Sequence, residues 1–149
     1  MDKQDTDYTE LLDYTTMTLS TADPDGQPHA APVYFAAQTG PLRLYFFSDP
    51  SSQHIQDAMA SQRAAAAIYP ACYDYQDIRG LQLHGLVRLV ERGAEWDLAW
   101  DLYQAKFPFV RHLKPVVARN SLYVFSPSWV RLVDNRRGFG FKQEWRLSP

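Results

Sequence analysis

The sequence has little cysteine and no strongly basic region. Its one cysteine, Cys72, cannot form an intrachain disulfide and has no CxxC partner with which to bind zinc. Fifteen basic residues against seventeen acidic ones give a formal net charge of −2, and no window forms the basic stripe that nucleic-acid binding needs. We therefore expect a protein of a reducing, cytoplasmic compartment that does not bind nucleic acid.

Long hydrophobic runs and common ligand motifs are also missing. No stretch approaches the roughly 18 apolar residues of a membrane span, and residues 1–10 are acidic and polar where a signal peptide is basic and then apolar. The chain has no GxGxxG, GxxxxGK[ST] or GxSxG, and its four histidines lack the i, i+4 spacing of a helical metal site. These absences predict no membrane partner, no metal and none of the common nucleotide loops.

Apolar and aromatic residues are abundant. Hydrophobic residues make up 46% of the 149 residues and aromatic residues 14%, which is enough to bury one core and leave a surplus for an interface. The length fits one domain better than two. We expect a single domain over residues 1–149, with residues 1–9 flexible.

The first half of the chain reads as strands joined by tight turns. After about two helical turns over residues 8–14, apolar residues alternate with threonine and serine over 16–20, which predicts a strand. Asp-Gly at 25–26 favours a hairpin turn that leads into a second strand over 29–37. A third strand, rich in aromatic residues, follows over 42–48.

Two helices interrupt the later strands. Pro50 and two serines open the first, within residues 49–62. The second, over 94–107, places aromatic residues at spacings of four, three and four, a pattern that is typical of core packing and ends at Pro108. Further strands are predicted over residues 63–69, 78–91, 121–125, 129–134 and 139–145, and the alternation in 78–91 changes phase after Gly85, which indicates a bulge.

This order predicts a mainly β fold with two or three short helices, an antiparallel barrel in preference to a βαβ sheet. Four strings in this order resemble the flavin-binding split-barrel family that includes pyridoxamine 5'-phosphate oxidase. The resemblance spans roughly residues 10–146, and its tail, with KFPFV, looks like a small bacterial branch of the family. It implies an antiparallel split β-barrel that forms a homodimer and binds FMN at the subunit boundary. The strings are MTLSTADPDGQPHAAPVYF, LYFFSDPSSQHIQDA, IRGLQLHGLVRLVE and DNRRGFGFKQEW.

The resemblance implies a flavin phosphate site where the third strand leads into the first helix. Phe47 and Ser48 match the family's aromatic-hydroxyl pair, and Ser52, Gln53 and His54 match its Ser-Arg-Lys or Ser-Arg-His sequence. Gln53 departs from the family, because an amide lacks the charge of an arginine–phosphate contact worth about 1.5–3 kcal/mol. His54 is then the one candidate cation. The alternative is an ordinary helix cap, with a serine on the backbone N–H groups and His54 in solvent.

Segment 31–36 matches the strand that runs beside the flavin ring, with Pro32, Val33 and Tyr34 at its centre. The oxidase has basic residues at both ends of this segment. Here the ends are Ala31 and Ala36, so the contacts that recognise a phosphorylated pyridoxine-type substrate are missing.

Three further residues are candidates through the resemblance. Gly80 stands where the oxidase has a glutamine near the ring, and Gln82, two residues on, lies on the same face of the strand. A polar, solvent-facing strand edge is the alternative for Gln82 and His84. Trp145 belongs to an aromatic and basic tail that is suited either to closing over the ring or to a dimer interface.

The resemblance thus implies an FMN-dependent oxidoreductase of unknown substrate, with a second copy of the chain and a small-molecule ligand as partners. The sequence offers no acid–base pair, so the catalytic residue stays unknown. The alternative is a non-enzymatic protein that has lost flavin and binds haem or another planar ligand. Four altered positions motivate it: Ala31, Ala36, Gln53 and Gly80.

Overall fold

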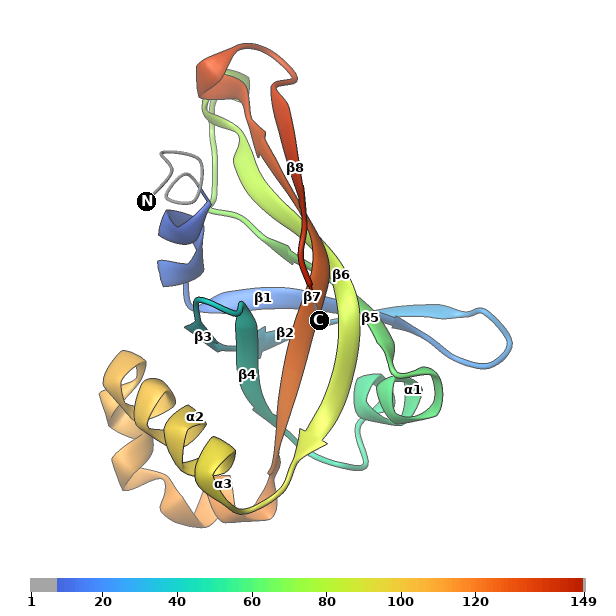
Figure 1. Cartoon of the computed structure of the whole chain (residues 1–149), viewed down its shortest axis with the longest axis vertical. Helices are drawn as coiled ribbons and strands as arrows, with labels where there is room; N and C mark the ends of the chain where they lie inside the picture. Colours follow the sequence, from blue (N-terminus) through green and yellow to red (C-terminus); the bar gives the residue numbers. More distant parts are fainter. Residues whose placement is uncertain (1–7, 149) are drawn as a thin grey trace.

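The computed structural model describes residues 8–148 and contains one eight-stranded sheet, curled into a half-barrel (Figure 1). The strand order is β2-β1-β5-β6-β7-β4-β3, β8 pairs with β7, and every pairing is antiparallel, as predicted. Of residues 1–9, which we expect to be flexible, residues 1–7 lie outside the described residues. The strands are β1 (Thr16–Ala22), β2 (Pro28–Tyr34), β3 (Ala36–Gln38), β4 (Arg43–Ser48), β5 (Arg63–Ile68), β6 (Arg79–Val90), β7 (Ser121–Asp134) and β8 (Lys142–Arg146).

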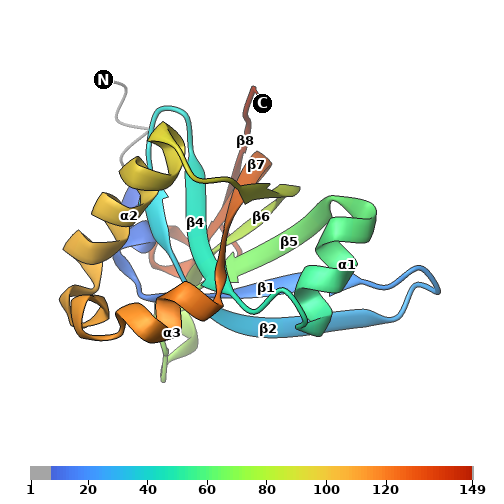
Figure 2. The ribbon, with the colours of Figure 1, turned by 90° about the horizontal axis from the view of Figure 1, so that it is seen from below.

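Three α-helices flank the sheet. In Figure 2, α1 lies beside β1, β2 and β5, while α2 and α3 lie on the side of β4. Within residues 8–148 no helix has both the length and the apolar character that crossing a membrane requires. The helices are α1 (Gln53–Ser61), α2 (Ala94–Lys106) and α3 (Lys114–Arg119), and the 3-10 helices are η1 (Thr9–Asp13), η2 (Tyr75–Asp77), η3 (Pro108–His112) and η4 (Asn135–Arg137).

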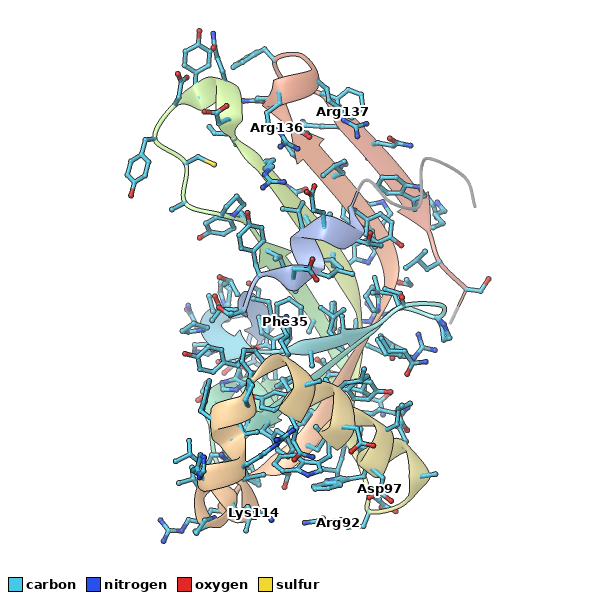
Figure 3. The ribbon with its side chains drawn as sticks, turned by 90° about the vertical axis from the view of Figure 1, so that its left-hand side faces the viewer. Phe35, Arg92, Asp97, Lys114, Arg136 and Arg137 are labelled. Carbon is cyan, nitrogen blue, oxygen red and sulfur yellow. The ribbon has the colours of Figure 1, made fainter. Side chains whose placement is uncertain are left out.

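The predicted strand over 29–37 is two strands. β2 ends at Tyr34 and pairs with β1, whereas β3 begins at Ala36 and pairs with β4. Phe35 between them is fully buried, and its backbone N–H donates to the carbonyl oxygen of Thr15 at 3.2 Å. At Phe35, labelled in Figure 3, the chain passes from β2 at one end of the strand order to β3 at the other.

The strands predicted over 121–125 and 129–134 are one continuous strand, β7. The bulge lies where it was predicted, beside Gly85, but the extra residue is Ser128 on β7. β6 therefore keeps its phase, and the change of phase occurs in β7, whose inward residues switch from odd to even numbers. Pro127 is tolerated inside a long strand because the bulge interrupts the ladder.

The aromatic stripe of α2 packs in the protein interior, as predicted. The rings of Trp96, Trp100 and Tyr103 meet Phe47 of β4 edge-on, with ring centroids 6.1, 5.8 and 5.0 Å away. This layer is separate from the main core inside the barrel, where Phe125 and Val130 of β7 are fully buried.

Lys106, the last residue of α2, fastens η1 to the helical layer. Its Nζ donates to the carbonyl oxygens of Leu12 at 2.9 Å and Tyr14 at 2.6 Å, and it lies 3.9 Å from the centroid of the Phe35 ring. Burial lowers the pKa of Lys106 to about 8. Lys106 thus holds the 3-10 helix η1 against α2, and it is not part of the junction between β4 and α1.

A buried carboxylate fastens α1 to β1 and β2. Asp57 is only 2% exposed, and its Oδ2 accepts hydrogen bonds from the Thr21 hydroxyl and from Nδ1 of His29, each at 2.9 Å. Its Oδ1 accepts a hydrogen bond from Nε2 of Gln53 at 2.8 Å. Desolvation raises the pKa of Asp57, but the three donated hydrogen bonds outweigh it, so the pKa lies below its ordinary value.

We expect Gly85→Ala to destabilise the fold. A Cβ at this position would meet the carbonyl oxygen of Ser126 and lie 2.7 Å from Cα of Pro127, and backbone atoms cannot swing aside. The free energy of unfolding should fall by roughly 2–3 kcal/mol in urea titrations. Gln82→Ala, at an exposed position of the same strand, should cost under about 0.5 kcal/mol. Equal midpoints for both variants would contradict the close approach at the bulge.

Asp57 should contribute to acid unfolding. A carboxyl whose pKa is lowered by folding stabilises the protein above its unfolded pKa of about 3.9, and this stability is lost as the pH falls through the folded pKa. Asp57→Asn should therefore be less stable than the wild type at pH 7 and should lose less stability below about pH 4. Asp25→Asn, in the exposed β1–β2 turn, is the control. An Asp57→Asn profile parallel to that of the wild type across acid pH would refute this.

Candidate functional site

The junction between β4 and α1 brings three of the expected residues together. Ser48 ends β4, is 8% exposed, and its Oγ lies 2.6 Å from Nε2 of His54. Ser52 Oγ lies 3.4 Å from the same nitrogen and donates to the carbonyl oxygen of Asp49 at 2.7 Å. Two hydroxyls and one imidazole thus meet at the start of the helix.

Among the described residues, no side chain caps the N-terminus of α1. Ser52 occupies the N-cap position with an extended backbone, but its hydroxyl makes no capping bond. Asp49 instead receives the backbone N–H and the hydroxyl of Ser51, each at 2.8 Å. Within residues 8–148 the first-turn N–H groups of α1 therefore have no side-chain acceptor, which is the arrangement that binds anions at helix N-termini.

The junction supplies hydrogen-bond donors but little positive charge. Partial burial lowers the pKa of His54, and the nearby negative charge of Asp57 offsets this only in part. At neutral pH the imidazole is therefore mainly uncharged. The amide of Gln53 is directed to Asp57. Neither residue brings the full cation that the family places here.

The β2 residues lie on a strand with one unpaired edge. β2 stands at the end of the strand order, so its outer backbone groups are open to a ligand or to another chain. Val33 is buried in the barrel, and Pro32 is exposed. Tyr34 is 49% exposed, and its ring centroid lies 5.1 Å from that of Phe107. Ala31 is half-buried on the inward side, opposite Leu19.

Gly80 and Gln82 lie on β6, away from the junction within one subunit. Gln82 pairs with Ala67, Ala67 with Thr18, and Thr18 with Pro32. Three strand spacings therefore separate Gln82 from β2, roughly 14 Å. Gln82 and His84 are exposed, yet β6 has a neighbour on each side and is not a sheet edge.

The tail aromatics do not form one cluster. Trp145 packs against the barrel core, with its ring centroid 4.9 Å from that of Tyr8. Phe139 is 84% exposed and contacts Tyr75, at the far tip of the arm made by β6, β7 and β8. In Figure 3 Arg136 and Arg137 also lie at this tip, at the other end of the molecule from Lys114.

Sequence reasoning missed the pair formed by His29 and Asp57, which are 28 positions apart. One local signal was available, since Gln53 and Asp57 are four residues apart and therefore share a face of α1. A carboxylate beside Ile55 and Ala58, on the apolar side of the helix, also required a buried partner. No signal in the sequence identified that partner as His29.

Comparison with known proteins covers most of the chain. Residues 7–134 match the family model described as pyridoxamine 5'-phosphate oxidase. The UPF0306 protein YhbP of Escherichia coli O157:H7 is 26% identical over 121 residues, which is 81% of this chain and 78% of YhbP.

Two solved structures share the fold at low identity. The conserved hypothetical protein Rv2991 of Mycobacterium tuberculosis has a TM-score of 0.73 and 20% identity, over 92% of this chain and 87% of its own. A heme binding protein of Mycobacterium smegmatis has a TM-score of 0.74 and 20% identity, over 90% of this chain and 53% of its own. The antiparallel split β-barrel expected from the sequence is thereby confirmed. Since the family model covers residues 7–134, this chain belongs to the pyridoxamine 5'-phosphate oxidase family.

Proposed function

We propose that this chain binds FMN as a homodimer, with the flavin phosphate at the N-terminus of α1, and acts as a flavin-dependent oxidoreductase. One observation carries the proposal: the uncapped first turn of α1 lies beside the hydroxyls of Ser48 and Ser52. The N-terminal end of a helix carries a partial positive charge of about +0.5, and its free N–H groups suit phosphate oxygens.

The junction fits a phosphate bound mainly by neutral donors. Ser48 and the first-turn N–H groups would donate hydrogen bonds, and Ser52 would do so by giving up its bond to the carbonyl oxygen of Asp49, while Gln53 and His54 add little charge. Loss of a charge-assisted contact weakens binding by about ten- to a hundredfold. We therefore expect FMN affinity below that of a site with an arginine at position 53.

The flavin ring would need residues from two subunits. Pro32 and Tyr34 lie on β2, which contacts α1. Gln82 on β6 and Trp145 on β8 lie several strands away from β2. A second copy packed near the β2 edge would bring its own β6 or β8 toward the ring. Bound FMN would supply the electron-transfer chemistry, and the residues of the chain would bind and orient it.

Haem binding without catalysis is the second candidate. It is favoured by the uncharged state of His54, because a neutral imidazole is the form that ligates a metal. The fold neighbour from Mycobacterium smegmatis is described as a heme binding protein. On this alternative the chain has lost flavin and binds haem or another planar ligand.

Purified protein incubated with FMN should show bound-flavin absorbance and a melting temperature that rises with FMN concentration. Ser48→Ala should weaken FMN binding by roughly fivefold, because one neutral hydrogen bond is lost. Ser61→Ala, at the opposite end of α1, is the matched control and should bind FMN like the wild type. No absorbance and no thermal shift at high micromolar FMN would refute the flavin proposal, and a haem Soret band would support the second candidate.

Gln53→Arg alone should raise FMN affinity by less than the full gain from an arginine. The side chain at this position lies within hydrogen-bond reach of Asp57, so a guanidinium would pair with the buried carboxylate. Gln53→Arg in an Asp57→Asn background should raise affinity about tenfold or more over Asp57→Asn alone, as measured by fluorescence titration. If neither arginine variant binds FMN, the site is not merely weakened and the haem alternative is favoured.

A further inference from the structure

An open cavity of about 930 Å³ lies on the outer face of the sheet, at the bulge between β6 and β7. Three residues that point outward from β6, His84, Leu86 and Arg88, line it in succession. Drug-sized ligands occupy pockets of roughly 300–1,000 Å³, so the space suffices for a small organic molecule. The cavity lies at the C-terminal end of α1, about 14 Å along the helix from the junction with β4.

Two arginines flank the floor of this cavity. Arg63 of β5 is the cross-strand partner of Leu86, and Leu86 is the partner of Ser126 on β7. Arg43 of β4 follows in the same row, since its neighbour Leu44 pairs with Phe125. Across four neighbouring strands the row therefore contains an arginine, a leucine, a serine and a second arginine.

The cationic charge of the cavity is only partly compensated. Arg88 forms an ion pair with Glu95 of α2, in which its Nη2 lies 2.7 and 3.0 Å from the two carboxylate oxygens. Arg43 donates to the carbonyl oxygen of Leu42 at 2.8 Å, and its charge is offset only in part by Glu95, whose pKa it helps to lower. The guanidinium of Arg63 has no hydrogen-bond or ion-pair partner within residues 8–148. No carboxylate lines the cavity in this part of the chain.

Guanidinium groups on two sides, of which that of Arg63 is unpaired among the described residues and that of Arg43 only partly compensated, favour an anion. Their forked N–H donors suit a carboxylate or a phosphate. The floor between them favours an apolar group, because the side chain of Leu86 is 50% exposed there. Ser126 places a hydroxyl between the two arginines. The lining thus combines a place for an anionic head with a place for an apolar body.

We propose that this cavity is a second ligand site, which binds an organic anion with a carboxylate or phosphate head and an apolar body. The site shares no residue with the α1 junction and does not depend on flavin binding. Gln62, the left-handed C-cap of α1, lines the cavity at the end of the helix that is remote from the junction.

The test is calorimetric titration of the full chain with phenyl phosphate, phenylacetate and inorganic phosphate. Both aromatic anions should bind saturably, and inorganic phosphate more weakly, because it lacks the apolar body. Arg63→Gln should weaken binding of the aromatic anions roughly tenfold, since a charge-assisted contact is lost. Arg119→Gln removes an exposed arginine at the end of α3, outside the cavity, and should leave binding unchanged.

Equal affinities of the wild type and Arg63→Gln, or no saturable binding up to about 10 mM, a weak limit for a small ligand, would overturn the proposal. Arg43→Gln, on the opposite wall, tests the same contact if Arg63→Gln folds poorly, and circular dichroism monitors folding of each variant. FMN titrations of the same variants separate the two sites. Unchanged FMN affinity in Arg63→Gln is expected, whereas its loss would contradict the flavin site at α1 and leave the anion site standing.

Discussion

The arrangement of the junction between β4 and α1 depends on the hydrogen bonds that the buried carboxylate of Asp57 accepts. A charge enclosed by protein must be hydrogen-bonded, so the helix that carries it has to lie where Thr21 and His29 can donate. That requirement fixes the direction in which α1 leaves β4 and therefore where its first N–H groups face. The same carboxylate holds the amide of Gln53 and acts on the charge of His54. Anchoring of the helix and the electrostatics of its N-terminus are consequently properties of one group.

The bulge between β6 and β7 has a comparable influence on the other side of the sheet. Because Ser128 is an extra residue, β7 points odd-numbered residues such as Phe125 into the barrel before the bulge and even-numbered residues such as Val130 after it. Val124, on the other face of β7, packs with the α2 layer. The added residue therefore keeps both ends of β7 in one hydrophobic core, and the local break in the ladder leaves the hollow that Arg63 borders.

Much of the fold could be predicted from local sequence, because period-two alternation and turn residues act over a few positions. The hairpin at Asp25-Gly26, the aromatic face of α2 and the position of the bulge were predictable in this way. The break at Phe35 was not, since it follows from burial of one ring among distant strands. The bulge was assigned to the wrong strand because an apparent change of phase around Gly85 concealed the real one in β7.

The candidate site was less predictable than the fold. The meeting of Ser48, Ser52 and His54 followed from their spacing around one strand-to-helix junction. The electrostatic state of that junction did not, because it depends on burial of His54 and on a carboxylate whose partners come from other strands. Sequence identifies donors, whereas charge is decided by the three-dimensional surroundings.

The prolines of β2 have a consequence for self-association. Pro28 and Pro32 lack a backbone N–H, and they lie four residues apart in β2, whose outer edge is unpaired among the described residues. Proline is tolerated in an edge strand where its nitrogen faces away from the ladder. The outer edge of β2 therefore lacks a backbone hydrogen-bond donor at both of these positions. A further strand cannot add to this edge with a complete ladder, so copies of the chain are discouraged from polymerising through continuous sheets.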